Sequence, residues 1–199
     1  MTTLMEPLVL RARPALTPTD DEFFEFCRQN NDLRIEQTAQ GEWIIMPPTG
    51  FETGSRNNEV SRQLGNWARQ DGTGVAVDSS TGFILPNGAK RSPDASWVLR
   101  SRLAALTPEQ KRKFLPLCPD FVVELRSPSD SLADAQDKMA EYQGNGARLG
   151  WLVDAAERRV HVYRPGAAPD VLDAPVSVAA DPELAGFVLD LARVWEPGF

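Results

Sequence analysis

The sequence has few of the residues that build metal clusters or disulfide scaffolds. It holds one His, His161, and two Cys, Cys27 and Cys118, which lie far apart with no further His or Cys at ligand spacing. Neither a zinc site nor a disulfide framework is therefore indicated, and we expect two partly buried thiols. We expect His161 to point away from the core, because it alternates with Val160 and Val162 along a predicted strand.

Long apolar runs and a secretory signal are also missing. No stretch approaches the roughly 18 apolar residues that a helix needs to cross a bilayer, and the first residues lack an uninterrupted apolar segment. We therefore expect no membrane partner and a cytoplasmic protein. Positive charge is scarce too, since 21 Lys and Arg stand against 28 Asp and Glu, for a net charge of −7. Such a field repels nucleic acid overall, so binding to it would need a local basic strip.

What is present fits one folded domain. A chain of 199 residues, 42% hydrophobic and 25% charged, is typical of a globular protein that can bury a single core. No internal repeat and no long linker divides it. We predict one domain over residues 1–199, with residues 1–16 as a candidate extended arm.

Helical periodicity and strand-like runs alternate along the chain. Helices are predicted over about 17–31, 53–70 and 131–144, with shorter ones over 109–114 and 186–197. Strands are predicted over 33–37, 42–48, 74–80, 82–86, 95–99, 121–125, 149–154 and 158–165. The run FVVEL is continuously apolar around its one acid, so we expect it in the centre of the sheet. The pattern predicts an α/β protein.

Two acidic residues occupy strand positions where an ionised side chain is costly. Asp94 begins a strand after Ser92-Pro93, and Glu124 lies inside the central strand. A buried carboxylate needs a positive partner, which can be a divalent cation shared with a second carboxylate or a basic side chain. Arg126 projects from the same face of the strand as Glu124, so a structural ion pair between them competes evenly with a metal site.

Lys138 adds weight to the metal site. It lies on the helix after the central strand, about 40° around the helix from Tyr142, at the edge of the apolar stripe. Its stem could therefore lie on the sheet while its ammonium group reaches past the strand ends. The alternatives are a solvated Lys138, or a helical pair with Asp134 one turn earlier.

Several ordered segments resemble one known family. The chain holds, in the family's order, PTGFETGSRNNEVSRQLGNWA, GFILPNGAKRSPDASWV, CPDFVVELRSPSD, DKMAEYQGNGARLGWLVD and GFVLDLARVW. Together they resemble the Uma-two family of restriction endonuclease-like proteins, from about residue 17 onward. The resemblance implies a PD-(D/E)XK nuclease core, in which helices flank a mixed central β-sheet.

The same resemblance implies a metal-dependent endonuclease that hydrolyses DNA with Mg²⁺ or Mn²⁺. Asp94 and Glu124 match the metal ligands of the superfamily, and the backbone carbonyl of Leu125 would join them. The usual lysine, two residues after the glutamate, is replaced by Arg126. In this family the lysine matches Lys138, with Tyr142 one turn beyond as a supporting residue.

The resemblance also suggests a weaker ligand and leaves one alternative function open. Glu59, on the first long helix, matches a position where some superfamily members keep a further acid, whereas the His that many relatives carry near Asn57 is missing. A guanidinium cannot act as a base at neutral pH, so Arg126 would clamp a phosphate oxygen and Lys138 would orient the attacking water. The alternative is a catalytically inactive nuclease-fold module that binds nucleic acid or protein. A homodimer would suit cleavage of two strands.

Overall fold

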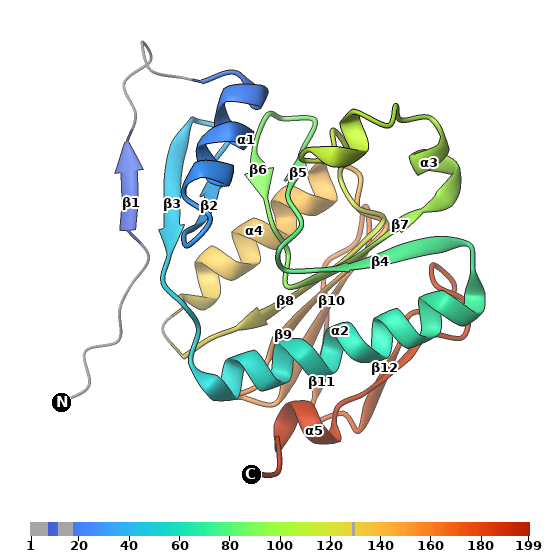
Figure 1. The fold of residues 1–199 in the computed structure, drawn as a ribbon. Coiled ribbons are helices and arrows are strands. Elements are labelled where there is room, and N and C mark those ends of the chain that lie inside the picture. Colours follow the sequence, from blue (N-terminus) through green and yellow to red (C-terminus); the bar gives the residue numbers. More distant parts are fainter. Residues whose placement is uncertain (1–7, 12–17, 129) are drawn as a thin grey trace, which may run out of the picture.

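The computed structural model describes residues 8–11, 18–128 and 130–199. Along the chain the elements are β1 (Leu8–Arg11), α1 (Asp20–Gln29), β2 (Arg34–Gln37), β3 (Glu42–Met46), α2 (Phe51–Asp71), β4 (Gly74–Asp78), β5 (Phe83–Ile84), β6 (Lys90–Arg91), β7 (Ala95–Leu99), α3 (Arg100–Ala104), η2 (Gln110–Arg112), β8 (Phe121–Arg126), α4 (Leu132–Gly144), β9 (Leu149–Asp154), β10 (Arg159–Tyr163), β11 (Asp170–Asp173), β12 (Ser177–Ala179), β13 (Val188–Asp190) and α5 (Ala192–Trp195). In the described residues the chain forms a six-stranded sheet, here called the large sheet, a five-stranded sheet, called the small sheet, and the strand pair β12 and β13. Helices α2 and α4 enclose the large sheet (Figure 1).

The larger sheet has six strands in the order β11-β10-β9-β8-β7-β4. Strands β8 and β9 run parallel, while the other neighbours are antiparallel, so the sheet is mixed. Helix α4 provides the crossover between the two parallel strands, as such a connection requires. The run FVVEL forms most of β8, which has a partner on each side, and this confirms the predicted central strand.

Each face of this sheet is covered by its own helix. On one face, α2 packs through Val60 and Leu64, together with the C-terminal strands. On the other face, α4 packs through Met139 and Tyr142. Successive residues of a strand point to opposite faces, and in β8 the residues on both faces are buried because each face is covered by a helix. Glu124 points to the face that α4 covers. In Figure 1, α2 crosses in front of these strands, and α4 lies on their other side, toward the small sheet.

The smaller sheet has the order β1-β3-β2-β6-β5. The strands predicted over 33–37 and 42–48 are present as β2 and β3, which pair antiparallel as a hairpin. Residues from its β5 and β6 end, Phe83, Leu85 and Ala89, share a core with Met139 and Tyr142 of α4. The small sheet therefore lies over the same face of the large sheet as α4, and this places β2 beside the helix that carries Lys138.

Local signals set several of the helix ends. Thr19 caps α1, because its hydroxyl accepts from the Glu22 amide and the Glu22 carboxylate accepts from the Thr19 amide at 2.8 Å. Helix α2 stops at Gly72, whose φ of 73° lies in the left-handed region that glycine adopts without strain. At the start of α4 the Ser131 hydroxyl accepts from the Asp134 amide. The predicted first helical residue, Thr17, lies outside the described residues.

Some predicted elements differ from those observed. The predicted helix over 109–114 is only the short turn η2, while α3 forms where no helix is predicted. The predicted closing helix over 186–197 is divided, because its first half pairs with β12 as strand β13 and only Ala192–Trp195 is helical. Of the candidate arm, residues 8–11 form β1 on the edge of the small sheet, and its other residues lie outside the described ones.

His161 does not face solvent as the alternation suggests. It does point to the face opposite Val160 and Val162, but that face is covered as well, and His161 is 6% exposed. The sheet is buried on both sides at this strand, so alternation no longer separates core from surface. No helix in the described part of the chain combines the length and apolar character needed to cross a membrane.

Candidate functional site

The predicted acids meet at one end of the two central strands. In the antiparallel pair of β7 and β8, Ala95 lies opposite Val123. Asp94, one residue before Ala95, therefore comes beside Glu124 and Leu125. Both carboxylates are buried, with Asp94 7% and Glu124 8% exposed. The structure thus brings together the two residues that the sequence singles out.

Asp94 is held by three donors from three elements. Its Oδ2 accepts from the backbone amide of Leu125 at 2.9 Å. Its Oδ1 accepts from Arg34 Nη1 of β2 at 3.3 Å and from Asn57 Nδ2 of α2 at 3.2 Å. These bonds fix the orientation of the carboxylate. Leu125 thus contacts Asp94 through its backbone amide, whereas the predicted ligand is its carbonyl.

Glu124 is bound from α4. Its Oε1 accepts from the Tyr142 hydroxyl at 2.9 Å and lies 2.9 Å from Lys138 Nζ. Burial raises the pKa of Glu124 to about 7, although the charge of Lys138 opposes this and the charge of Asp94 adds to it. Burial and the neighbouring carboxylate also raise the pKa of Tyr142 well above its ordinary value, so this hydroxyl keeps its proton and donates it.

Lys138 bridges Glu124 to a second acid that the sequence reading did not select, Glu36. Lys138 Nζ lies 3.0 Å from Glu36 Oε1, and Glu36 is only 2% exposed. The same oxygen accepts from the Ser92 amide at 2.9 Å, and Glu36 Oε2 accepts from Arg91 Nη1 at 3.2 Å. Burial would raise the pKa of Glu36, but the charges of Lys138 and Arg91 outweigh it and lower that pKa.

Lys138 itself is charged. Burial favours its neutral form, but Glu124 and Glu36 together raise the pKa of its amine above the ordinary value. The expected alternatives for this residue, a solvated side chain or a pair with Asp134, are therefore wrong. The ammonium group, which the sequence predicts to reach past the strand ends, contacts Glu124 and Glu36.

The ion pairs around the site form two groups. Lys138 and Arg91 link Glu124, Glu36 and Glu141, and Arg91 Nε donates to Glu141 Oε2 at 2.6 Å. Arg34 pairs separately with Asp94. The two groups together hold four acids and three bases, so one negative charge is in excess when all four acids are ionised.

Arg126 does not pair with Glu124, so the predicted structural ion pair is wrong. Its Nη1 lies 2.6 Å from Asp154 Oδ2 and its Nε donates to the Asp130 carbonyl at 3.1 Å. Arg126 lies directly opposite Asp154 in the parallel pair of β8 and β9, and this register brings the two side chains together. Asp154 is a buried partner at the end of β9.

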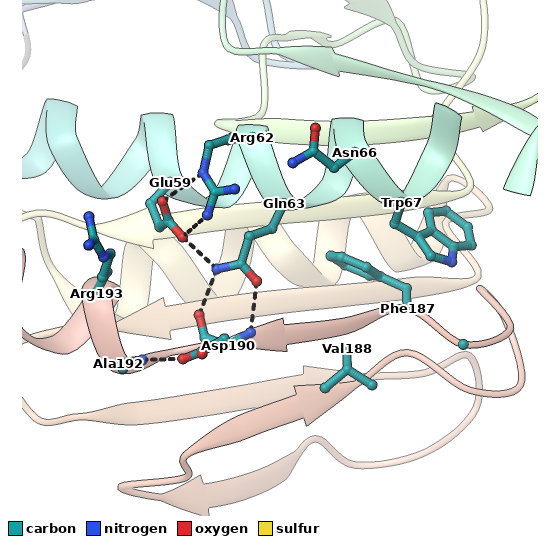
Figure 2. Close-up of a pocket in the computed structure, with 11 residues that line it drawn as sticks. Glu59, Arg62, Gln63, Asn66, Trp67, Phe187, Val188, Asp190, Ala192 and Arg193 are labelled. Atoms are coloured by element: carbon teal, nitrogen blue, oxygen red, sulfur yellow. Dashed lines mark hydrogen bonds and ion pairs between the residues drawn. The ribbon is translucent and has the colours of Figure 1, made fainter. Parts of the chain in front are cut away.

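Glu59 lies away from the other acids. It accepts hydrogen bonds from Arg62 and Gln63 of its own helix. Figure 2 shows it in a groove between α2 and the C-terminal segment, where Gln63 Nε2 donates to the Asp190 carbonyl at 2.9 Å. Two residues along an α-helix turn it by about 200°, so Glu59 points away when Asn57 points to Asp94. The structure gives no support to Glu59 as a ligand beside Asp94 and Glu124.

Most of the additional residues come from the hairpin and from the turn before Asp94. Glu36 did carry a signal, because it is an acid inside a strand-like run, as Glu124 is. The polar neighbours Arg34 and Gln37, however, make the run over 33–37 resemble a solvent-exposed strand. Ile35, Glu36 and Gln37 are in fact all buried, because both faces of β2 are covered.

The donor set fits a divalent cation in its chemistry. Carboxylate and amide oxygens are the ligands that Mg²⁺ and Mn²⁺ prefer. Asn57 Oδ1 is a buried acceptor that has no hydrogen-bond partner among the described residues, and its own amide nitrogen donates to Asp94. In the part of the chain that the structure describes, no group of three or more His, Cys, Asp or Glu is already arranged as a metal cluster. A cation here would have to draw on Asp94, Glu124 and non-acidic oxygens.

Comparison with known proteins agrees with this geometry. The family model Uma2, described as "Putative restriction endonuclease", matches residues 20–192. The chain belongs to this family. A search of curated proteins found no match. Among solved structures, a protein from Anabaena variabilis ATCC 29413, described as a "putative nuclease belonging to DUF820", is similar with a TM-score of 0.71 and 20% sequence identity, over 89% of this chain and 97% of that one.

Membership of the Uma2 family confirms the resemblance seen in the sequence. The fold is the restriction endonuclease-like α/β fold, with a mixed central sheet flanked by helices. At 20% identity the solved structure supports the fold alone. The roles of Asp94, Glu124 and Lys138 rest on the geometry of this chain.

Proposed function

We propose that this Uma2 protein is a metal-dependent endonuclease that hydrolyses phosphodiester bonds of DNA. The observation that carries the proposal is the buried pair of Asp94 and Glu124 at the end of two adjacent strands, with Lys138 bound to one of them. Pairs of acids around a divalent cation are a common arrangement for phosphodiester hydrolysis. Family membership supports a nuclease and a nucleic-acid substrate.

Mg²⁺ or Mn²⁺ would be held by Asp94, Glu124 and the carbonyl of Leu125. The amide oxygen of Asn57 would be a further ligand of the ion or would accept a hydrogen bond from water bound to it. When bound, the cation supplies positive charge at the phosphate and a water of lowered pKa. When the four acids around the site are ionised, their one excess negative charge over the three bases supports a cation at this place.

The protein side chains have separate tasks in this proposal. Tyr142 donates to Glu124 and so orients its carboxylate. Lys138 is charged, so it cannot accept a proton, but it can donate to an attacking water or to the oxygen on which charge develops. Arg126 is held by Asp154 and by a backbone carbonyl, so the contacts of the site lend no support to its predicted phosphate clamp.

Metal titration together with DNA cleavage tests the proposal. Mg²⁺ and Mn²⁺ would be titrated calorimetrically into the wild-type protein and into Asp94→Asn, while nicking of plasmid and of single-stranded DNA is followed in parallel. Asp170→Asn, at an exposed carboxylate on β11, is the matched control. Binding and nicking that vanish only in Asp94→Asn would support the proposal. Unchanged nicking in purified Asp94→Asn would refute it.

One observation favours the alternative of an inactive nuclease-fold module. Lys138 already lies within 3.0 Å of both Glu36 and Glu124, so these acids are partly neutralised without any cation. Such a module would bind no Mg²⁺ in the millimolar range. It would bind nucleic acid or protein, and the Asp94→Asn variant would bind the same partner. The same titration separates the two functions.

We also propose a cytoplasmic homodimer, since cleavage of two strands suits two copies of the site. Light scattering of the purified protein with and without duplex DNA tests the oligomeric state. A monomer under both conditions would refute the dimer and leave the nuclease proposal standing.

A further inference from the structure

Arg34 is the cation that lies directly against the proposed metal ligand Asp94. It begins β2, and its Nη1 lies 3.3 Å from Asp94 Oδ1. Its Nη2 donates to the carbonyl of Ser92 at 2.5 Å, in the turn that leads to Asp94. The guanidinium is thus anchored beside Asp94 by the backbone, and with a side chain 33% exposed it also reaches solvent.

The other basic groups of the site are each held more tightly. Arg91 lies between Glu36 and Glu141, and Lys138 lies between Glu36 and Glu124. Arg34 has one carboxylate contact, and its 3.3 Å separation is longer than the 2.7–2.9 Å usual for a charged pair. Its Nε is buried and has no hydrogen-bond partner among the described residues. Of the positively charged side chains of this site, Arg34 is therefore the one with the fewest carboxylate contacts and with a buried N–H donor that lacks an acceptor among the described residues.

We propose that Arg34 binds the phosphate of the substrate beside the metal site, with Asp94 and the Ser92 carbonyl holding it in place. This proposal rests on the proposed function, and it assigns to Arg34 the phosphate contact that the sequence assigns to Arg126. A guanidinium suits the role because it stays charged and offers two parallel donors to a phosphate. It forms no covalent bond and transfers no proton, so it acts only on the charge of the phosphate.

Arg34 should have opposite effects on two affinities: it should weaken the binding of the metal ion and strengthen the binding of the phosphate. Arg34 and a divalent cation both interact with Asp94, so the guanidinium weakens cation binding. Removing its charge should tighten Mg²⁺ binding by about tenfold, the effect of one charge at about 5 Å from a divalent ion in a water-like medium. The same removal takes donors from the phosphate and weakens its binding by about 10- to 100-fold. A residue that only supported the fold would not produce this opposition.

Three variants test the inference. Arg34→Met removes the charge, Arg34→Lys keeps the charge but loses the paired donors, and Arg28→Met removes an exposed Arg that pairs with Glu25 on α1 as a control. Mg²⁺ binding would be measured by calorimetry. Phosphate binding would be measured with thymidine 3′,5′-bisphosphate in the presence of Ca²⁺, and cleavage of labelled duplex DNA at saturating Mg²⁺.

We expect Arg34→Met to bind Mg²⁺ more tightly, to bind the bisphosphate more weakly and to cleave about 100-fold more slowly, as for loss of one charge-stabilising donor. Arg34→Lys should bind Mg²⁺ as the wild type does and still bind the bisphosphate more weakly. If Arg34→Met fails to fold, Arg34→Lys decides the question alone. The control should match the wild type in every assay.

Two results would overturn the inference. One is a bisphosphate affinity and a cleavage rate that are unchanged in the folded Arg34 variants, which would leave the nuclease proposal intact. The other is a wild-type protein that binds Mg²⁺ but no bisphosphate. A wild type that binds both and cleaves no DNA would instead refute the proposed function, while the loss of bisphosphate binding in Arg34→Met would still support the phosphate contact.

Discussion

Lys138 should stabilise the metal-free protein more than any exposed Lys can, because it compensates two buried acids. Its Nζ lies 3.0 Å from Glu36 and 2.9 Å from Glu124, whose side chains are 2% and 11% exposed. Removing one partner of a buried ion pair costs about 3–5 kcal/mol, since the remaining charge loses its compensation. Lys138→Met keeps most of the volume of the side chain, so the loss of charge dominates. We expect the free energy of unfolding to fall by about 3–5 kcal/mol.

The cost should depend on pH and on divalent cations. Without Lys138, Glu124 can take up a proton instead, and its pKa is already raised to about 7 by burial. The destabilisation should therefore be smaller at pH 5.5, below this pKa, than at pH 8, where a proton on Glu124 costs more free energy. A cation bound at Asp94 and Glu124 should also restore part of the loss, because ligand binding stabilises the folded state by mass action.

Urea unfolding followed by circular dichroism measures the effect, in EDTA and in excess Mg²⁺. Lys113→Met is the matched control, because Lys113 pairs with two exposed acids, Asp21 and Glu109, and exposed pairs contribute about 1 kcal/mol or less. A loss in Lys138→Met no greater than in Lys113→Met would refute the reasoning that Lys138 compensates buried charge. Equal losses at pH 5.5 and pH 8 would refute the part assigned to Glu124.

Further predictions concern the site and the core. Tyr142→Phe should lower the free energy of unfolding by about 1.5–3 kcal/mol, because Glu124 loses a buried donor, and a change below about 0.5 kcal/mol in urea unfolding would contradict this. In EDTA, the stability of the wild type relative to Glu124→Gln should fall as pH rises from 4.5 to about 7, because the raised pKa means that the folded state holds the proton more tightly; a pH-independent difference would contradict it. Gly74→Ala should lower the melting temperature, since a Cβ there would overlap the ring of Trp97, whereas Gly65→Ala on α2 has open space and should raise it; the reverse order would contradict the packing.

The sequence predicted much of the large sheet and half of the site. The central strand was legible because apolar residues surround Glu124 without interruption, and helical periodicity marked the helix that carries Lys138 and Tyr142. Strand and helix positions singled out Asp94 and Lys138, and resemblance to the family implied their roles. These signals are local, because each depends on periodicity or spacing within a single segment.

Two of the wrong predictions share one cause. The alternative that pairs Arg126 with Glu124 relied on their common face of β8, and the expectation that His161 points away from the core relied on its alternation with Val160 and Val162. The neighbouring strand decided the first, since Asp154 lies directly opposite Arg126. The covering of both faces decided the second. Periodicity gives the face on which a side chain lies, but not what covers that face.

The sequence by itself determined which elements form and which acids must find a positive partner in the core. The tertiary structure alone decided which partners they find. Lys138 and Glu36 are 102 residues apart in the chain, and Arg34 and Asp94 are 60 apart, yet each pair is in contact. These contacts exist because the small sheet packs over the face of the large sheet that carries Glu124. Such packing depends on the combined shape and burial of many side chains, and no local pattern in the hairpin specifies it.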